Sequence, residues 1–468
     1  MKKNGVVYQI YPRSFQDSDG DGVGDLAGIR ARLDHLVWLG VDALWMSPIY
    51  PSPNADFGYD VSDYTGVDPV YGDLAEFDAL SEAAHARGLD LLMDIVPCHT
   101  SIEHPWFREH PDWYIWRDEP NNWLSAFGGS AWTRLGDRYY LHSFYPEQPD
   151  LDWRNPEVVR AMQGVLSFWL ERGADGYRVD AIDRLLKDEQ LRDEPPATEA
   201  FGLPLTEEEA KLAHIYAGNA PDTGAALAKI REACGDAFLV GEVYLPSTRW
   251  QPYTDYFDSV FAFELLHSPW EAGALRAAIE ATTRQPGAAW VMSNHDFGRL
   301  STRFGEENAR AAAMLLLTLP GPAFLYQGDE IGQGEGQPGE ARFDRAGRDR
   351  HRHPMQWDAQ GGFTTGEPWL PLTDPAQRNV ADQRDDPSSM MSLVRALIEL
   401  RHELGDGFEL LDAAEGVVAF RRGAHTVAIN TTSESLPAPF AGEPRIQTQA
   451  GVVRDGMLAP HAGAIALG

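Results

Sequence analysis

The sequence predicts an α/β fold, namely a (β/α)8 TIM barrel with an inserted subdomain after the third strand and a small C-terminal antiparallel β domain. Three observations lead to this prediction. Eight short apolar runs recur along the chain, a polar or glycine-rich loop follows each of them, and helical patterns separate most of them. The strands of a parallel barrel are buried on both faces, so they should be continuously apolar rather than alternating, and these runs are.

The expected strands and helices follow one another in the order that a barrel requires. The eight expected strands are Val6–Ile10, Ala43–Met46, Leu91–Val96, Gly176–Val179, Phe238–Val240, Ser259–Phe263, Ala289–Met292 and Ala323–Tyr326. The expected helices are Leu26–Leu39, Leu74–Arg87, Pro156–Arg172, Thr223–Ala233, Glu307–Leu317 and Ser388–Leu404. The longest apolar stretch, Ala311–Tyr326, is broken by two prolines and a glycine, so it predicts a helix followed by a strand and not a membrane span.

Two segments depart from this alternation. The tryptophan-rich stretch His99–Trp153 has no room for a simple helical return, which predicts the inserted subdomain; its tryptophans either stack on sugar faces or only hold a loop-rich fold together. The polar segment Lys187–Pro221 predicts a surface excursion after the fourth strand, and the short alternating runs beyond Leu404 predict the C-terminal β domain. The expected boundaries are 1–98 and 154–404 for the barrel, 99–153 for the subdomain and 405–468 for the C-terminal domain.

The chain is strongly acidic. Of its 468 residues, 43% are hydrophobic, 71 are Asp or Glu and 39 are Lys or Arg, which gives a formal net charge of -32. Such a surface repels phosphate backbones and anionic lipids, so we expect no nucleic-acid partner and no membrane partner, while a neutral substrate suits it. Acidity also keeps a protein in solution, and this simpler explanation accounts for much of it.

The N-terminus and the cysteines bear on the compartment. Residues Met1–Tyr8 include two lysines but no apolar segment as long as that of a signal peptide, so we expect the cytoplasm. The two cysteines, Cys98 and Cys234, do not make a disulfide framework in so long a chain and are expected to be free thiols.

Three acidic residues each follow a short apolar run that reads as the end of a buried strand. They are Asp180, Glu242 and Asp296. In an α/β barrel such strand ends meet at the face that carries the chemistry. Two carboxyl groups brought together can divide the roles of acid and nucleophile on a glycosidic bond, and a third can stabilise positive charge on the sugar.

The neighbours of these acids strengthen the hypothesis. Arg178 stands two residues before Asp180, so on a strand both side chains point to the same face, where the arginine can keep the carboxylate ionised. A simple ion pair would read the same way. Burial of Glu242 would raise its pKa and keep it protonated as a general acid, and Asp296 follows His295, a second group that can hydrogen-bond sugar hydroxyls.

Several separate motifs resemble the α-amylase superfamily, glycoside hydrolase family 13, and within it the α-glucosidase and oligo-1,6-glucosidase branch. The motifs are Asp94–Thr100, Gln148–Asp152, Gly176–Asp180, Gly241–Val243 and Asn294–Asp296, and the resemblance runs nearly end to end. It implies that Asp180 is the nucleophile, Glu242 the acid/base and Asp296 the transition-state stabiliser. The reaction would then retain configuration through a covalent glucosyl-enzyme, with the first two carboxyl groups about 5 to 5.5 Å apart.

The resemblance also implies a closed, exo-acting pocket for one terminal glucose. The residues that match its sugar-binding positions are Asp56, Tyr59, His99, Phe144, Gln148, Arg178, His295 and Arg348. Three positions depart from the family pattern. Cys98 and Asp152 stand where Asn is usual, and Ala181 stands where relatives often carry Val for α-1,6 or Thr for α-1,4 bonds, so the sequence leaves the linkage preference open.

An acidic loop near the N-terminus predicts a metal site. Carboxylates at every second position, with one backbone carbonyl among them, suit a hard cation such as Ca²⁺. The expected ligands are Asp17, Asp19, Asp21, Val23 and Asp25. Relatives bind Ca²⁺ or Mg²⁺ in this loop, and its expected role is structural; a metal-free Asp- and Gly-rich turn is the alternative. We expect no organic cofactor.

The sequence therefore predicts an exo-acting α-glucosidase that acts on short oligosaccharides or α-glucosides, as a monomer or homodimer. An α-glucosyltransferase or sucrose isomerase of the same family shares the first chemical step and stays open as an alternative. A non-catalytic relative with a binding or transport role would tend to lack the three acids and to carry a membrane anchor, whereas all three acids are present and no anchor is visible.

Overall fold

The computed structural model describes residues 2, 4–197, 207–340 and 344–467 of the chain. Within this part, eight strands form a closed barrel in the order β1-β11-β10-β9-β8-β7-β3-β2, which confirms the predicted fold class. The strands are β1 (Val6–Ile10), β2 (Ala43–Met46), β3 (Asp90–Ile95), β7 (Gly176–Val179), β8 (Phe238–Gly241), β9 (Ser259–Phe261), β10 (Ala288–Val291) and β11 (Ala323–Tyr326).

The eight strands lie where the apolar runs predict them, with shifts of one or two residues at their ends. The largest shift is at β9, which ends at Phe261 because Ala262 leaves the extended conformation (φ -80°, ψ 68°) and the short helix α8 (Phe263–His267) begins at once. Nearly every barrel-strand residue is buried, as strands covered on both faces must be.

The chain divides into two compact units, each described separately below. Unit 1 consists of Met1–Leu44, Ala83–Asp90 and Ala262–Gly468, and unit 2 of Trp45–Glu82 and Leu91–Phe261.

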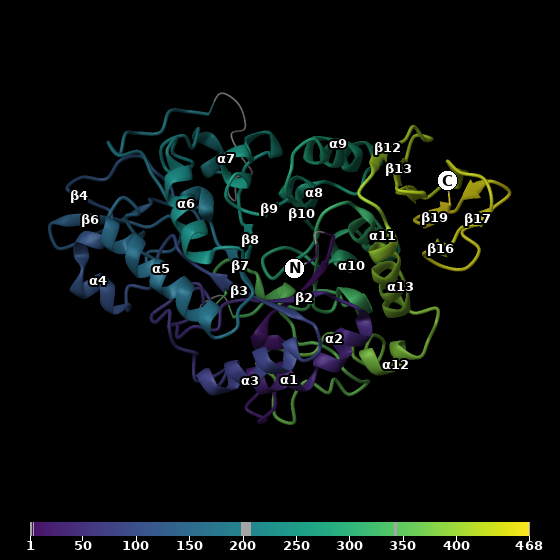
Figure 1. The fold of residues 1–468 in the computed structure, drawn as a ribbon, viewed down its shortest axis with the longest axis horizontal. Coiled ribbons are helices and arrows are strands. Elements are labelled where there is room, and N and C mark those ends of the chain that lie inside the picture. Colours follow the sequence, from purple (N-terminus) through teal and green to yellow (C-terminus); the bar gives the residue numbers. More distant parts are fainter. Residues whose placement is uncertain (1, 3, 198–206, 341–343, 468) are drawn as a thin grey trace. The chain divides into compact units, whose positions relative to one another are not determined.

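Unit 2 contains the inserted segment, which holds a small sheet in the order β4-β6-β5. Figure 1 labels two of these strands, β4 and β6. These strands are β4 (Trp116–Arg117), β5 (Trp132–Leu135) and β6 (Arg138–Leu141), and a short helix α4 (Pro105–Glu109) precedes them. Trp123 and Trp132 lie in the apolar core of this segment, 1% and 5% exposed. At these two positions the tryptophans hold the loop-rich segment together, which is the second of the two roles expected for them.

Helices cover the barrel strands of unit 2. Helix α5 (Pro156–Glu171) begins where the Asn155 side chain accepts the N–H of Glu157 and Pro156 occupies the first turn. It packs beside α6 (Thr223–Cys234), as Figure 1 shows. The predicted excursion Lys187–Pro221 is described only in part, because residues 198–206 lie outside the described residues. Its described part includes a single 3-10 turn, Glu209–Lys211.

Unit 1 holds the buried helix α11 (Ala309–Thr318), which packs against α13 (Met390–Glu403). Helix α11 is apolar apart from Arg310 and Thr318 and ends before Pro320, so the predicted helix followed by a strand is confirmed. None of the described helices is long and apolar enough to cross a membrane.

The remaining helices are α1 (Leu26–Ala31), α2 (Leu33–Leu39), α3 (Leu74–His85, which crosses the unit boundary), α7 (Gln251–Thr254, in unit 2), α9 (Ala272–Thr283), α10 (Leu300–Arg303) and α12 (Val380–Arg384).

Two helix predictions need correction. The single helix expected at Leu26–Leu39 is two helices, because Arg32 leaves the helical conformation (φ -104°, ψ 4°) while its side chain donates to Gln16 Oε1 at 2.6 Å. Helix α9 was not predicted. Its buried residues repeat at helical spacing, but two of the four, Ala278 and Thr282, are small or polar.

The C-terminal region is antiparallel β structure, as predicted. One sheet has the order β12-β13-β14-β19-β16 and a smaller one the order β15-β18-β17. The strands are β12 (Phe408–Leu410), β13 (Val417–Arg422), β14 (His425–Asn430), β15 (Leu436–Pro437), β16 (Ile446–Gln447), β17 (Val453–Arg454), β18 (Met457–Leu458) and β19 (Gly463–Leu467).

Candidate active site

Arg178 is the centre of a buried ionic cluster in unit 2. It lies on β7 and is 1% exposed. Its Nη1 contacts Asp94 Oδ1 at 2.9 Å and Asp180 Oδ1 at 2.5 Å, and its Nη2 contacts Glu242 Oε1 at 2.7 Å. The two-residue strand spacing thus does bring Arg178 and Asp180 together. One guanidinium holds both acids to which the sequence assigns the chemistry.

Asp94 is the member of this cluster to which the sequence analysis gave no role. It lies beside Arg178 in the register of β3 and β7 and is fully buried. Its Oδ2 accepts hydrogen bonds from Trp45 Nε1 at 3.1 Å and Tyr59 Oη at 2.9 Å. The sequence carried a signal for Asp94, which is the one carboxylate in the apolar run Leu91–Val96, because a buried charge needs a partner.

The cluster sets the protonation of its carboxyl groups. Burial raises the pKa of Asp180 to about 6 and that of Asp94 to about 6, although the Arg178 charge opposes both shifts. The Glu242 side chain, as a hydrogen-bond partner, opposes the rise in the pKa of Asp180. Only a protonated carboxyl group can donate to a carboxylate, so the pair can supply one carboxylate and one acid.

Ala181, directly after Asp180, has a left-handed backbone (φ 44°, ψ 44°). This turn aims its N–H at Glu242 Oε2, 3.2 Å away. Tyr244 Oη donates to the other oxygen of Glu242 at 3.3 Å. The residue flagged for linkage preference therefore also orients the second acid through its backbone.

A second group of predicted sugar-binding residues gathers in unit 2 around Gln148. Its Nε2 donates to Asp56 Oδ2 at 3.0 Å and lies 3.1 Å from His99 Nε2. The Phe144 ring lies 5.2 Å from the His99 ring, and Arg178 lies over the Tyr59 ring at 5.6 Å. Burial lowers the pKa of His99, so the ring is neutral at pH 7.

Unit 1 holds the third acid in a cluster of its own. Asp296 Oδ1 contacts Arg348 Nη1 at 2.8 Å and Arg352 Nη2 at 3.0 Å, and Oδ2 lies 3.1 Å from His295 Nε2. Arg348 thus contacts a carboxylate, and its contact with the sugar stays a prediction. Arg352 was missed; it stands four residues after Arg348 in the same arginine-rich segment.

The predicted metal loop is also in unit 1. Carboxylate oxygens of Asp17, Asp19 and Asp21 lie within 4.8 Å of one another. Asp25 lies outside this group and caps α1, accepting the N–H of Gly28 at 2.6 Å. Three carboxylates so close together repel one another, so a divalent cation fits this group.

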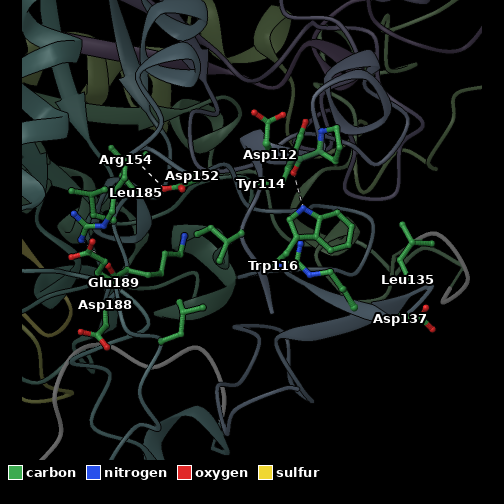
Figure 2. Close-up of a pocket in the computed structure, with 16 residues that line it drawn as sticks. Asp112, Tyr114, Trp116, Leu135, Asp137, Asp152, Arg154, Leu185, Asp188 and Glu189 are labelled. Atoms are coloured by element: carbon green, nitrogen blue, oxygen red, sulfur yellow. Dashed lines mark hydrogen bonds between the residues drawn. The ribbon is translucent and has the colours of Figure 1, made fainter. Parts of the chain in front are cut away.

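One further cavity, of about 900 Å³, lies in unit 2 (Figure 2). It is bounded by the inserted sheet and by the segment after Asp180, with Trp116, Leu135 and Arg154 among its walls. None of the predicted catalytic or sugar-binding residues lines it. Asp152, one of the departures from the family pattern, does.

Comparisons with known proteins agree with one another. The model of the alpha amylase catalytic domain matches residues 9–407. An alpha-glucosidase of Apis mellifera is 38% identical over 449 residues, covering 86% of this chain and 78% of that protein. An oligo-1,6-glucosidase of Parageobacillus thermoglucosidasius is 36% identical over 479 residues, covering 86% and 83%. The crystal structure of the alpha-glucosyl transfer enzyme XgtA superposes with a TM-score of 0.92 at 38% identity, covering 100% of this chain and 99% of that one.

Proposed function

The chain belongs to the α-amylase catalytic-domain family, glycoside hydrolase family 13, and on that premise we propose that it is a retaining, exo-acting α-glucosidase. It would release terminal non-reducing glucose from short α-linked oligosaccharides or α-glucosides. The observation that carries the proposal is the single Arg178 guanidinium that contacts both Asp180, at 2.5 Å, and Glu242, at 2.7 Å. Adjacent carboxyl groups suit retention, since inversion needs room for a water between them.

The proposed reaction has two displacements. A carboxylate oxygen of Asp180 attacks the anomeric carbon while protonated Glu242 gives its proton to the departing glycosidic oxygen, which leaves as an alcohol. The product of this step is a glucosyl ester of Asp180. Glu242, now ionised, takes a proton from a water whose oxygen attacks the same carbon, so Asp180 leaves as a carboxylate and glucose keeps its α configuration. Arg178 stabilises the negative charge that moves between the two acids.

The remaining roles are proposals as well. Asp56, Tyr59, His99, Phe144 and Gln148 would bind the terminal glucose. Asp296, kept ionised by Arg348 and Arg352, would stabilise the positive charge that develops on the sugar ring.

We also propose a structural Ca²⁺ or Mg²⁺ at the N-terminal loop, held by Asp17, Asp19 and Asp21 with the Val23 carbonyl as a further ligand, while Asp25 caps α1. It would hold the loop and take no part in the reaction. A cytoplasmic location and a monomeric or homodimeric state stay predictions.

Glucosyl transfer is the second candidate function, favoured by the similarity to the alpha-glucosyl transfer enzyme. It differs only in the second displacement, where a sugar or alcohol replaces water. Product analysis at rising acceptor concentration separates the two, because a transferase forms a new glucoside at the expense of free glucose.

The test of the proposal is a hydrolysis panel on maltose, isomaltose, sucrose and p-nitrophenyl α-glucoside. We expect glucose release, and we expect NMR of the first product to show the α anomer. The variant Asp180→Asn should lose roughly 10³-fold or more in kcat. Asp188→Asn is its matched control, since Asp188 follows on the same segment but pairs with Arg192. A β-anomer product, or an active Asp180→Asn enzyme, would refute the mechanism.

A further inference from the structure

The His295 ring is held on two edges and one face. Its Nδ1 lies 2.8 Å from Gln9 Nε2, and its Nε2 lies 3.1 Å from Asp296 Oδ2. The Tyr11 ring stacks on it at 5.9 Å, with 17° between the planes. Gln9 lies on β1 and is 1% exposed, and His295 is fully buried.

These contacts determine where the imidazole carries its proton. The NH₂ group of an amide can only donate, so the Nδ1 facing Gln9 must offer a lone pair, and the proton must be on Nε2, where it is donated to Asp296. The reverse amide orientation would require Nδ1–H, and a neutral ring would then point a lone pair at the Asp296 carboxylate, which is repulsive.

A doubly protonated ring would satisfy that reverse orientation, but the surrounding charges oppose it. Gln9, Tyr11 and Asp296 contact the ring itself, and Arg348 and Arg352 contact the other oxygen of Asp296. Asp296 already carries the two guanidinium contacts described above, and Arg352 Nε also donates to the backbone carbonyl of His295 at 2.9 Å. An imidazolium would be a third cation around one carboxylate, and like charges disfavour one another.

We infer that Gln9 is a positioning residue, which fixes His295 as the neutral Nε2–H tautomer and thereby aims a hydrogen-bond donor at Asp296. The inference rests on the proposed role of Asp296 as the transition-state stabiliser. Hydrogen bonds from His295 on one oxygen and from the arginines on the other then hold the carboxylate plane in one orientation. The sequence carried a signal for this residue, because Gln9 is the one amide in the otherwise apolar and aromatic run Val6–Ile10.

The direct test is NMR of the wild-type protein labelled with ¹⁵N-histidine, at pH 7. The chain has 14 histidines, and the signals that disappear in His295→Gln assign the ring. We expect an unprotonated Nδ1 and a protonated Nε2. Detection of the Nδ1–H tautomer, or of an imidazolium, would overturn the inference whether or not the protein proves to be an α-glucosidase.

Kinetics give the functional test, with kcat and KM measured on p-nitrophenyl α-glucoside between pH 4.5 and 8. Gln9→Leu removes the donor and should lower kcat about tenfold while KM changes less. Gln9→Glu replaces the donor by a carboxylate that accepts a proton from Nδ1, so imidazolium becomes populated near neutral pH and a new loss of kcat appears as the pH falls.

The matched control is Gln333→Leu, which removes another fully buried amide donor of unit 1, one that bonds the Pro354 carbonyl at 2.9 Å. It should keep the wild-type pH profile. If the wild type releases glucose and both Gln9 variants keep its kcat and pH profile, the inference is wrong. If the wild type releases no glucose, the proposed function fails instead. Should Gln9→Leu not fold, the wild-type NMR result and Gln9→Glu decide.

Discussion

Replacing Asp94 by Asn should move the pH dependence of the enzyme. Asp94 and Asp180 both contact Arg178 Nη1, at 2.9 and 2.5 Å, so their two oxygens are no more than about 5.4 Å apart, the sum of those contacts. At an effective dielectric constant of about 20, two charges at that distance repel by about 3 kcal/mol. This energy corresponds to about 2 pKa units. Asn keeps the shape of the side chain but removes the charge, so the pKa of Asp180 should fall from about 6 by up to roughly that amount.

The sign of the effect follows from the proposed role of Asp180 as the nucleophile. A nucleophile must be ionised, so kcat/KM falls as the pH drops through the pKa of the free enzyme. In Asp94→Asn that acid limb should lie up to about 2 pH units lower than in the wild type. The assay is kcat/KM on p-nitrophenyl α-glucoside from pH 3.5 to 8, and the measured value belongs to the coupled cluster rather than to one residue.

The control is Asp329→Asn. Burial raises the pKa of Asp329 to about 7, but this carboxyl group pairs with Ser293 and belongs to unit 1. Its replacement should leave the acid limb in place. An unshifted acid limb in Asp94→Asn would refute the reasoning, because it would mean that the Asp94 charge is not felt at the nucleophile.

Three other predictions concern stability. His104 Nδ1 accepts the N–H of Trp106, and burial lowers the pKa of this histidine to about 4. Protonation therefore favours the unfolded chain, and the free energy of unfolding falls as the pH drops from about 6.5 towards 4. By linkage the loss at pH 5 is roughly 2 kcal/mol. Urea unfolding at pH 7.5 and pH 5 should show this loss in the wild type and not in His104→Asn, which keeps a capping oxygen; equal losses would contradict it. Ala181→Val should cost about 1 to 2 kcal/mol in the free energy of unfolding, because a branched side chain resists the left-handed backbone, whereas Ala181→Gly should cost less; the reverse order would show that the turn relaxes. Ca²⁺ at a hundred times its Kd should stabilise the protein by about 2.7 kcal/mol and raise its Tm. EDTA or the substitution Asp19→Ala should abolish this rise. A Tm that changes neither with Ca²⁺ nor with EDTA would exclude the metal.

The sequence predicted well whatever depends on neighbouring residues. Continuous apolar runs located the barrel strands because burial on both faces leaves no other pattern. The two-residue spacing of Arg178 and Asp180 predicted their contact for the same local reason. The helix α9 was missed because Ala278 and Thr282 on its buried face are small or polar, so its periodicity is faint.

Contacts between distant segments were the harder part. Asp94, Arg352 and Gln9 reach their partners 84, 56 and 286 residues away. A polar residue in an apolar run, such as Asp94 or Gln9, is a local signal, but it does not identify a partner that lies far along the chain. The break at Arg32 has the same origin, because its side chain is bound to Gln16 in the loop before the helix.

The shared guanidinium of Arg178 has a consequence for how this enzyme can be altered. Asp94, Asp180 and Glu242 all contact the same cation, so a change at one of them alters the electrostatic environment of the other two. The effects of substitutions in this set should therefore be non-additive. A change of working pH made within the cluster, such as Asp94→Asn, therefore alters all of its members at once. A milder route is Trp45, whose hydrogen bond to Asp94 can be weakened without removing a charge.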